Sequence, residues 1–446
     1  MAKKPKLAKA NAANPRAVLP PPTRRQAPVV TAALTPGPPH TRNAVVMAPR
    51  LALTTKIVSA SEAKKMPRRP KGPVPRRNPV DPAQTLAPVR VAMFASPTAR
   101  AGASARAAVS AAPTVATFQG GSSGNPDVVP PDTHGAVSAV SAFTPLNNRV
   151  FFRDRDGAQQ QPSVTLDAFW NDFAQGPSVS TFDPKVVFDP FMRRFIFVTC
   201  GNAEREDSCI LVAVSETEDA TGNWHFGRID PDAQIRRRNA WFDYPSLGFT
   251  DDKITVSLNL FAVADSAFKG VAVFAIDKAS LLNPPHQMIF DQFVMANQGF
   301  TLVPAVTLEA GIADQHILAS WSGNSRGSGH LALYALTGSV AGGTTALNRL
   351  GFLEISNMTW DETGGQIAPQ KGSSRRLDVG DDRMLTVCRR DGRLHAAHSV
   401  FLGSGADKRS LVQWYTITLN PSPVVAEVGR IDGLERGMFF GIPALQ

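Results

Sequence analysis

The phrase Asp183-Pro184-Lys185-Val186-Val187 is the most informative stretch for the fold, because closely related phrases recur along the chain. They are Tyr244-Pro245-Ser246-Leu247, Val303-Pro304-Ala305-Val306 and Ile442-Pro443-Ala444-Leu445. The prolines at 184, 245 and 304 are spaced by 61 and 59 residues. A similar stretch starts at Pro131, 53 residues before Pro184, and residues 378–382 divide the longer interval before 443. Six starts at a roughly constant period indicate a repeat fold.

Short strands and turns, rather than helices, fill the intervals between these starts. Apolar and polar residues alternate within Ile254–Phe261, which is typical of a half-buried strand. Other runs are apolar throughout: 195–198, 210–214, 271–276 and 331–336. Such strands need cover on both faces, as they have between neighbouring propeller blades. We therefore predict an all-β fold, a β-propeller of about six blades with the last blade incomplete. A β-sandwich is the alternative, but it gives no reason for the repeat.

The N-terminal quarter of the chain differs from the rest in charge and composition. Residues 1–110 hold 20 of the 47 lysines and arginines, only two acids, 18 of the 36 prolines and one aromatic residue. Such a segment has too little apolar area to offset the entropy of ordering. We predict a disordered basic tail and linker over residues 1–112, followed by a β-propeller domain over residues 113–446. The tail could bind an anionic partner, such as nucleic acid or an anionic surface.

The N-terminus lacks the apolar stretch of a secretory signal, and no stretch approaches about 18 consecutive apolar residues. The three cysteines are Cys200, Cys209 and Cys388, without the paired spacing of a metal site. Cys200 and Cys209 flank a turn between two apolar runs. They form either a disulfide, in an oxidising compartment, or two buried free thiols, and the sequence leaves both open.

Four stretches together resemble an uncharacterised family of bacterial, usually exported, β-propeller proteins. They are PPDTHGAV at 130–137, FDPKVVFDP at 182–190, AVSETEDATGNW at 213–224 and WFDYPSLGF at 241–249. The resemblance covers about residues 116–446, and it implies a propeller that is exported or at the cell surface. Family members usually carry an export signal, and they usually continue beyond a phrase like FGIPAL at 440–445. The resemblance supplies no catalytic residues.

Acidic residues gather near the starts of the repeats. They are Asp132, Asp183, Asp243, Asp378, Asp381 and Asp382. If these phrases begin the innermost strands, several carboxylates could meet at one mouth of the central channel and bind Ca²⁺, which prefers six to eight oxygen ligands. The alternative, which we favour, is that these aspartates cap loops.

Residues 217–224 are close to the Asp-box turn of sialidase-like propellers. We expect this turn to be structural: Asp219 caps it, Gly222 permits an unusual backbone angle and Trp224 packs beneath it. A sialidase would also need arginines for a substrate carboxylate and a tyrosine paired with a glutamate. Arg236, Arg237, Arg238 and Tyr244 are the candidates for these roles.

Two hypotheses for function follow from these observations. The first is a non-enzymatic propeller used for binding or as a scaffold, with a glycan or protein ligand on one face. The second is a sialidase-like glycan hydrolase. Convergent arginine, tyrosine and glutamate side chains would favour the hydrolase. Because no catalytic motif is evident, we expect a binding protein rather than an enzyme.

Overall fold

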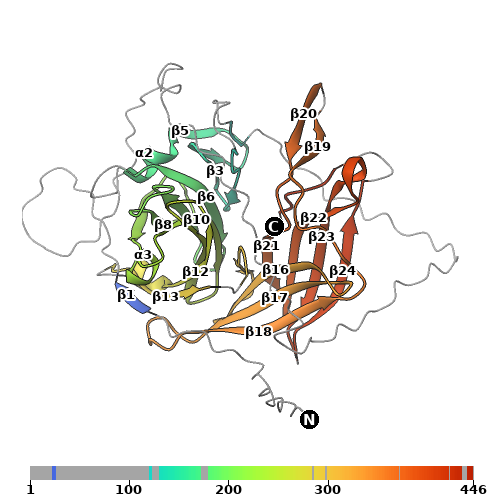
Figure 1. Ribbon diagram of the computed structural model, residues 1–446. Helices are drawn as coiled ribbons and strands as arrows, with labels where there is room; N and C mark the ends of the chain where they lie inside the picture. Colours follow the sequence, from blue (N-terminus) through green and yellow to red (C-terminus); the bar gives the residue numbers. More distant parts are fainter. Residues whose placement is uncertain are drawn as a thin grey trace, which may run out of the picture.

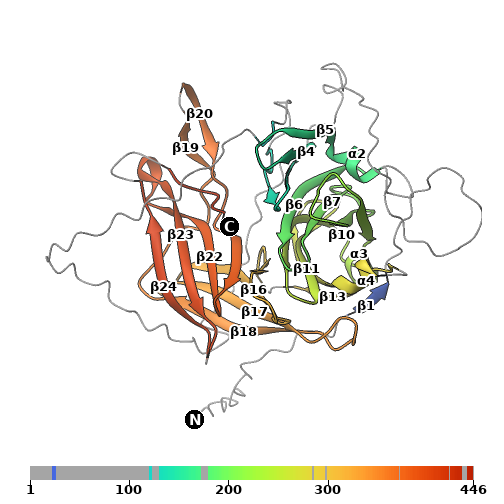
Figure 2. The same ribbon diagram turned by 180° about the vertical axis from the view of Figure 1, so that it is seen from behind.

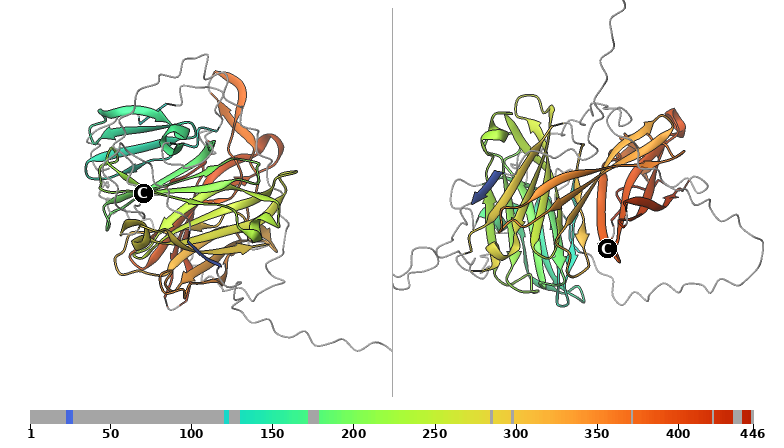
Figure 3. Two further views of the ribbon diagram at one scale, coloured as in Figure 1. Left: turned by 90° about the vertical axis from the view of Figure 1, so that its left-hand side faces the viewer. Right: turned by 90° about the horizontal axis from the view of Figure 1, so that it is seen from below.

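The computed structural model describes residues 23–26, 120–122, 130–171, 179–283, 286–296, 299–370, 372–420, 422–433 and 439–444. Within these ranges the chain forms five four-stranded antiparallel blades arranged around a common axis, which confirms the β-propeller fold (Figure 1). Blades 1 to 3, coloured teal to yellow, lie on one side of the molecule and blade 5, in red, on the other (Figure 2). Blade 4, in orange, connects the two sides (Figure 3).

The elements follow the blades in chain order. Blade 1 contains β2 (Ala136–Val137), β3 (Ser141–Leu146), β4 (Arg149–Asp154) and β5 (Gln159–Thr165). Blade 2 contains β6 (Thr181–Asp189), β7 (Arg194–Gly201), β8 (Cys209–Ser215) and β9 (Trp224–Ile229). Blade 3 contains β10 (Ala240–Phe249), β11 (Lys253–Ala262), β12 (Phe268–Asp277) and β13 (Ile289–Met295). Blade 4 contains β14 (Val303–Pro304), β16 (Gln315–Ser325), β17 (Ser328–Thr337) and β18 (Ala346–Ile355). Blade 5 contains β21 (Met384–Arg390), β22 (Arg393–Leu402), β23 (Arg409–Thr418) and β24 (Val424–Ile431).

The remaining elements connect or extend the blades. The helices are short: α2 (Leu166–Asn171), α3 (Ala233–Arg236), α4 (Lys278–Leu282) and the 3₁₀ turn η2 (Gly405–Asp407). β15 (Val306–Thr307) pairs in parallel with β10 and β21, and so links blades 3 and 5. β19 (Gln366–Gln370) and β20 (Ser373–Asp378) form a separate hairpin between blades 4 and 5. No helix among the described residues is long and apolar enough to cross a membrane.

The repeated phrase is a strained entry into the first strand of a blade. Asp183 and Tyr244 precede the prolines of β6 and β10, and they have φ of 53° and 51°. The pairing of β6 with β7 and of β10 with β11 shifts register at the same places. Left-handed φ is rare for residues other than glycine and costs of order 1–3 kcal/mol. The phrase therefore marks a bulge at which the chain turns into each blade.

Polar residues of β11 are buried because the next blade covers them. Asn259 Oδ1 accepts the Thr301 N–H (2.9 Å), and Asn259 Nδ2 donates to Thr301 Oγ1 (2.9 Å). The Ser257 hydroxyl donates to the carbonyl of Leu302. All ten residues of β11 are buried. The prediction that this strand is half-buried is therefore wrong, because the side chains on its polar face form hydrogen bonds with the entry segment of blade 4.

The second strands of later blades make comparable contacts with the segment that follows. The Ser320 hydroxyl in blade 4 donates to Asp382 Oδ2 (2.7 Å) before blade 5. In blade 5, Ser399 Oγ accepts the N–H of Ile442 (2.8 Å), and Ile442 has φ of 53°. Residues 439–444, which contain most of the sixth phrase, form no strand. The described ranges therefore form five complete blades where the repeat predicted about six with an incomplete last blade, because the sixth phrase contributes no strand and instead contacts blade 5.

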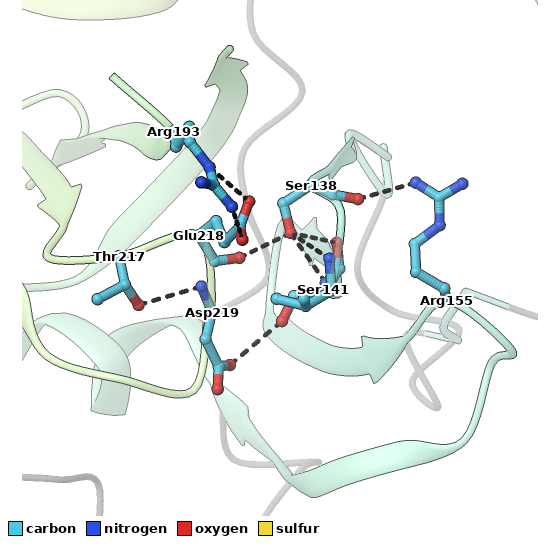
Figure 4. A network of polar contacts seen from close by, with 8 residues as sticks. Ser138, Ser141, Arg155, Arg193, Thr217, Glu218 and Asp219 are labelled. Atoms are coloured by element: carbon cyan, nitrogen blue, oxygen red, sulfur yellow. Dashed lines mark hydrogen bonds and ion pairs between the residues drawn. The ribbon is translucent and has the colours of Figure 1, made fainter. Parts of the chain in front are cut away.

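The turn between β8 and β9 joins blade 2 to blade 1 (Figure 4). Asp219 Oδ1 accepts the Thr221 N–H (2.9 Å) and the Ser141 hydroxyl (3.2 Å). Trp224 Nε1 donates to the carbonyl of Ala220 (3.0 Å). Gly222 does not have a left-handed φ. A Cβ there would lie 3.3 Å from the Asp219 carbonyl oxygen, so close approach explains the glycine. The structure agrees with the expected capping by Asp219 but not with an unusual backbone angle at Gly222.

Cys200 and Cys209 are free thiols, so the predicted alternative of a disulfide is wrong. The register pairs Gly201 with Cys209, which offsets Cys200 from Cys209 by one residue. Successive side chains of a strand point to opposite faces. Accordingly, Cys200 packs in the core between blades 2 and 3, while Cys209 packs in the core between blades 1 and 2.

Most of the basic tail predicted over residues 1–112 lies outside the described residues. The exception is β1 (Thr23–Gln26), which pairs antiparallel with β13, the outer strand of blade 3. In this register Arg24 stands opposite Asp291.

Candidate functional site

Tyr244 lies at the centre of a group of side chains from several blades. Lys185 Nζ is 5.1 Å from the centroid of its ring, and the guanidinium carbon of Arg383 is 4.4 Å from it. Both distances fall in the range of cation–π attraction. Lys185 belongs to β6 of blade 2, and Arg383 immediately precedes β21 of blade 5. We call these three residues, together with His134 of blade 1, the axial site.

A relay of hydrogen bonds through backbone amides positions Tyr244. Asn147 Oδ1 accepts the N–H of Asp183 (2.8 Å), and Asp183 Oδ2 accepts the N–H of Tyr244 (3.2 Å). Asp183 and Tyr244 are the two residues with left-handed φ described above. Strain of this kind persists where surrounding contacts over-determine it, and it concentrates at functional sites.

Arg383 is fixed by one carboxylate and two aromatic rings. Its Nε and Nη2 donate to Asp381 Oδ1 and Oδ2, each at 2.7 Å. The Phe300 ring centroid is 5.0 Å from its guanidinium carbon. Burial opposes the charged form, but the charge and hydrogen bonds of Asp381, with Tyr244 and Asp243 adding, outweigh burial and raise the pKa of Arg383 above its usual range. Arg383 is therefore a permanent cation beside Tyr244.

Lys185 and His134 are hydrogen-bond donors without an acidic partner in the described part of the chain. Lys185 is half-buried, and its Nζ takes part in no hydrogen bond or ion pair there. His134 Nδ1 accepts the N–H of Val186 (3.3 Å), which leaves the proton on Nε2. Burial and then the charge of Lys185 lower the pKa of His134 to about 3. His134 is therefore a neutral N–H donor at pH 7.

The axial site combines two cations, Lys185 and Arg383, with hydrogen-bond donors, and Asp183, Asp243 and Asp381 lie close to it. Two cations lie at the ring of Tyr244, His134 lies near Lys185, and the Tyr244 hydroxyl makes no hydrogen bond within the described ranges. Asp381 neutralises Arg383, so Lys185 is the cation of the axial site that has no carboxylate partner in the described ranges. Ammonium and guanidinium groups bind carboxylate and phosphate oxygens through charge-assisted hydrogen bonds. Lys185 is therefore the group of the axial site that suits an anionic ligand.

The six aspartates considered for calcium are not gathered into a metal-binding group in the part of the chain that the structure describes. No group of three or more His, Cys, Asp or Glu residues suited to a metal ion occurs in the described ranges, and all six aspartates lie within them. Asp183 accepts the Tyr244 N–H, and Asp381 pairs with Arg383. Asp382 is buried and accepts the Ser320 hydroxyl and the Trp360 indole N–H (2.8 Å). Asp378 is exposed and accepts the Gly380 N–H (2.9 Å).

The other two aspartates stand at blade entries. Asp132 is half-buried, with φ of 43°, and comes shortly before β2 of blade 1. Asp243 is half-buried, directly precedes Tyr244, and its charge helps to raise the pKa of Arg383. Because no metal-binding group occurs in the described ranges, the calcium hypothesis gains no support.

The arginines considered for a sialidase-like site lie elsewhere than Tyr244. Arg236 ends α3 and, like Arg237, is exposed. Arg238 donates to the carbonyl of Lys269 (3.3 Å), at the start of β12. The arginine beside Tyr244 is Arg383, which sequence reasoning missed.

The missed residues all lie within or directly after the repeated phrases, and this was the available signal. Lys185 directly follows Pro184, and Arg383 directly follows Asp381-Asp382 in the phrase that lacks a proline. His134 comes three residues after Pro131. Placing the repeated phrases around one propeller axis would have brought Lys185, Arg383 and His134 together.

Comparison with known proteins gives no family assignment. No family model matches the chain, and no curated protein matches it. Among solved structures, an exo-1,5-α-L-arabinanase from a bovine ruminal metagenomic library is 12% identical, covers 66% of this chain and 96% of its own, and has a TM-score of 0.33. A GH43 endo-arabinanase from Bacillus licheniformis is 15% identical, with coverages of 66% and 96% and a TM-score of 0.33.

A subtype N11 neuraminidase-like protein of A/flat-faced bat/Peru/033/2010 is also similar. It is 8% identical, covers 67% of this chain and 71% of its own, and has a TM-score of 0.30. At such identities and TM-scores, the comparisons say nothing about ligand or activity. The axial site has to be judged by its own geometry.

Proposed function

We propose that this propeller is a non-enzymatic binding module, and that the axial site holds a carboxylate of an acidic glycan. Lys185 carries the proposal. It is a half-buried ammonium group, 5.1 Å from the Tyr244 ring centroid, with no acidic partner in the described ranges. Partial burial of an unpaired charge costs free energy, which an incoming carboxylate would recover.

The neighbours of Lys185 supply the rest of a binding site. The neutral N–H of His134 and the Tyr244 hydroxyl can each donate to a ligand oxygen, which suits the many acceptors of a sugar acid. Asp381 already neutralises Arg383, whose role is to hold the Tyr244 ring through a cation–π contact. We therefore assign charge recognition to Lys185 and orientation to His134 and Tyr244.

Glycan hydrolysis is the second candidate, because an arginine and a tyrosine do converge. Hydrolysis with retention or inversion normally uses two carboxyl groups beside the scissile bond, and a sialidase uses tyrosine with a glutamate. In the described ranges Tyr244 contacts Asp183, Lys185 and Arg383 and hydrogen-bonds with no glutamate. Asp183 is engaged with the backbone of Tyr244. These contacts favour binding over cleavage.

Calorimetric titration of the full chain with trigalacturonate, galactotriose and inorganic phosphate tests the proposal. We expect binding of trigalacturonate, and a loss of about tenfold or more in Lys185→Ala, because a charge-assisted hydrogen bond contributes roughly 1.5–3 kcal/mol. Lys269→Ala, which removes an exposed lysine of β12, is the matched control and should bind like the wild type.

Three outcomes would contradict the proposal. Equal binding of the neutral trisaccharide would remove the role of charge. Unchanged affinity in Lys185→Ala would remove the axial site. Release of shorter sugars during the titration would replace binding with hydrolysis.

A further inference from the structure

The hairpin of β19 and β20 stands apart from the blades. It follows blade 4 in the sequence and projects beyond one end of blade 5, away from the labelled strands of blade 4 (Figures 1 and 2). Every residue of β20 is exposed, and β19 buries only Ala368. An isolated two-stranded hairpin is at best marginally stable in water. Packing in a blade therefore does not explain why this hairpin is formed.

The base of the hairpin is anchored to blade 5. The amides of Gly364 and Gly365 donate to the Gly380 carbonyl at 2.9 and 3.1 Å. Ala368 and Val379 pack on Phe401 of β22. A Cβ at Gly364 would lie 2.1 Å from the Phe401 ring, so the base fits closely against this blade. The hairpin is an arm with a fixed base.

The arm carries positive charge that is not neutralised within the described ranges. Arg375 and Arg376 are exposed, and neither has an acidic partner there. The Arg376 guanidinium donates to the carbonyl of Ile367 on the opposite strand (2.7 Å), which holds it against the hairpin. Leu377, next to it, has 51% of its surface exposed. Exposed cations beside an apolar side chain suit an anionic polymer better than a small ion.

The arm is close to the axial site along the chain. Asp378 ends β20, and Arg383 follows five residues later. Five residues span at most about 18 Å when fully extended. Asp381, which fixes Arg383, lies within the same connection. The base of the arm and the axial site are therefore parts of one short segment.

We propose that the hairpin is a second contact for the ligand of the axial site, which makes that ligand a polyanionic glycan of several acidic units. This inference rests on the proposed function. One carboxylate binds at Lys185, and further carboxylates along the same polymer bind at Arg375 and Arg376. Two linked contacts raise affinity beyond either one alone once the polymer is long enough to reach both.

The chain-length dependence of affinity tests this inference. We expect the wild type to bind octagalacturonate at least about tenfold more tightly than trigalacturonate, at matched concentration of sugar units. The double variant Arg375→Ala/Arg376→Ala should bind trigalacturonate like the wild type. It should bind octagalacturonate no more tightly than trigalacturonate. Arg236→Ala/Arg237→Ala removes another exposed arginine pair and serves as the matched control, which should keep the gain.

The outcomes separate the hairpin from the axial site. A length gain that survives in Arg375→Ala/Arg376→Ala overturns the inference while leaving the axial site intact. If Lys185→Ala does not weaken the trimer, the proposed function fails. If Lys185→Ala also keeps octamer binding while Arg375→Ala/Arg376→Ala loses it, the hairpin binds polyanions by itself. That result overturns the two-contact arrangement.

Discussion

Tyr244 combines a strained backbone with a crowded ring. Its φ of 51° is rare for a bulky residue, and the Asp183 carboxylate that accepts its N–H belongs to a second strained residue. Lys185 and Arg383 then place two cations within 5.1 Å of its ring centroid. Contacts from blades 2 and 5 thus support the strained backbone of Tyr244. Local sequence preference would not select this backbone conformation, which sets the position of the Tyr244 hydroxyl.

His134 makes stability depend on pH. Its pKa in the folded protein is about 3, below the value of about 6.5 of an unfolded chain, so the unfolded state binds the proton first as pH falls. Stability due to His134 is therefore complete above about pH 6.5 and is lost progressively toward pH 3. Between pH 7 and pH 5 the loss amounts to about 2 kcal/mol.

Urea unfolding at pH 7, 6 and 5 checks this prediction. His316, whose pKa is lowered to about 4 by burial and then by Arg389, adds a similar slope, so a variant is needed to isolate His134. In His134→Asn an amide oxygen can still accept the Val186 N–H, and we expect the slope to fall by about 2 kcal/mol over this range. An unchanged slope would mean that His134 is not held neutral.

Among elements, the turn between β8 and β9 ties blade 2 to blade 1. Asp219 accepts the Thr221 N–H within the turn and the Ser141 hydroxyl from the neighbouring blade. Ser138 contributes as well, since its hydroxyl donates to the Glu218 carbonyl (2.6 Å) (Figure 4). The turn is therefore a junction between blades as well as a hairpin cap.

Removing the Asp219 carboxylate should weaken this junction. We expect Asp219→Ala to lower the free energy of unfolding by about 1–3 kcal/mol, because the Ser141 hydroxyl and the Thr221 amide both lose an acceptor. Glu427→Ala on β24 is an exposed control and should change stability by less than about 0.5 kcal/mol. Equal effects of the two substitutions in chemical denaturation would argue against the junction.

The strands and entries of the blades could be predicted because their signals are local. Pro184, Pro245 and Pro304 lie within the first strands of blades 2, 3 and 4, as their spacing indicates. The burial of Asn259 could not be predicted, because its partner Thr301 belongs to the entry of the next blade. The fate of Cys200 and Cys209 depended on a one-residue offset in register, which spacing alone leaves open.

At the scale of the whole molecule, the ring arrangement creates the axial site. Arg383 meets Tyr244 only because blades 3 and 5 approach each other around the axis, and β15 links these two blades directly. The sequence showed that the phrases repeat, but it did not show that Lys185 and Arg383 would share one ring. A candidate site chosen from neighbours in sequence therefore selected Arg236, Arg237 and Arg238 instead.

The most direct test of the axial site is a crystal structure of the full chain with trigalacturonate. We expect a carboxylate of the sugar within about 3 Å of Lys185 Nζ, with sugar oxygens near His134 Nε2 and the Tyr244 hydroxyl. A sugar bound on another surface, with Lys185 still unpaired, would contradict it.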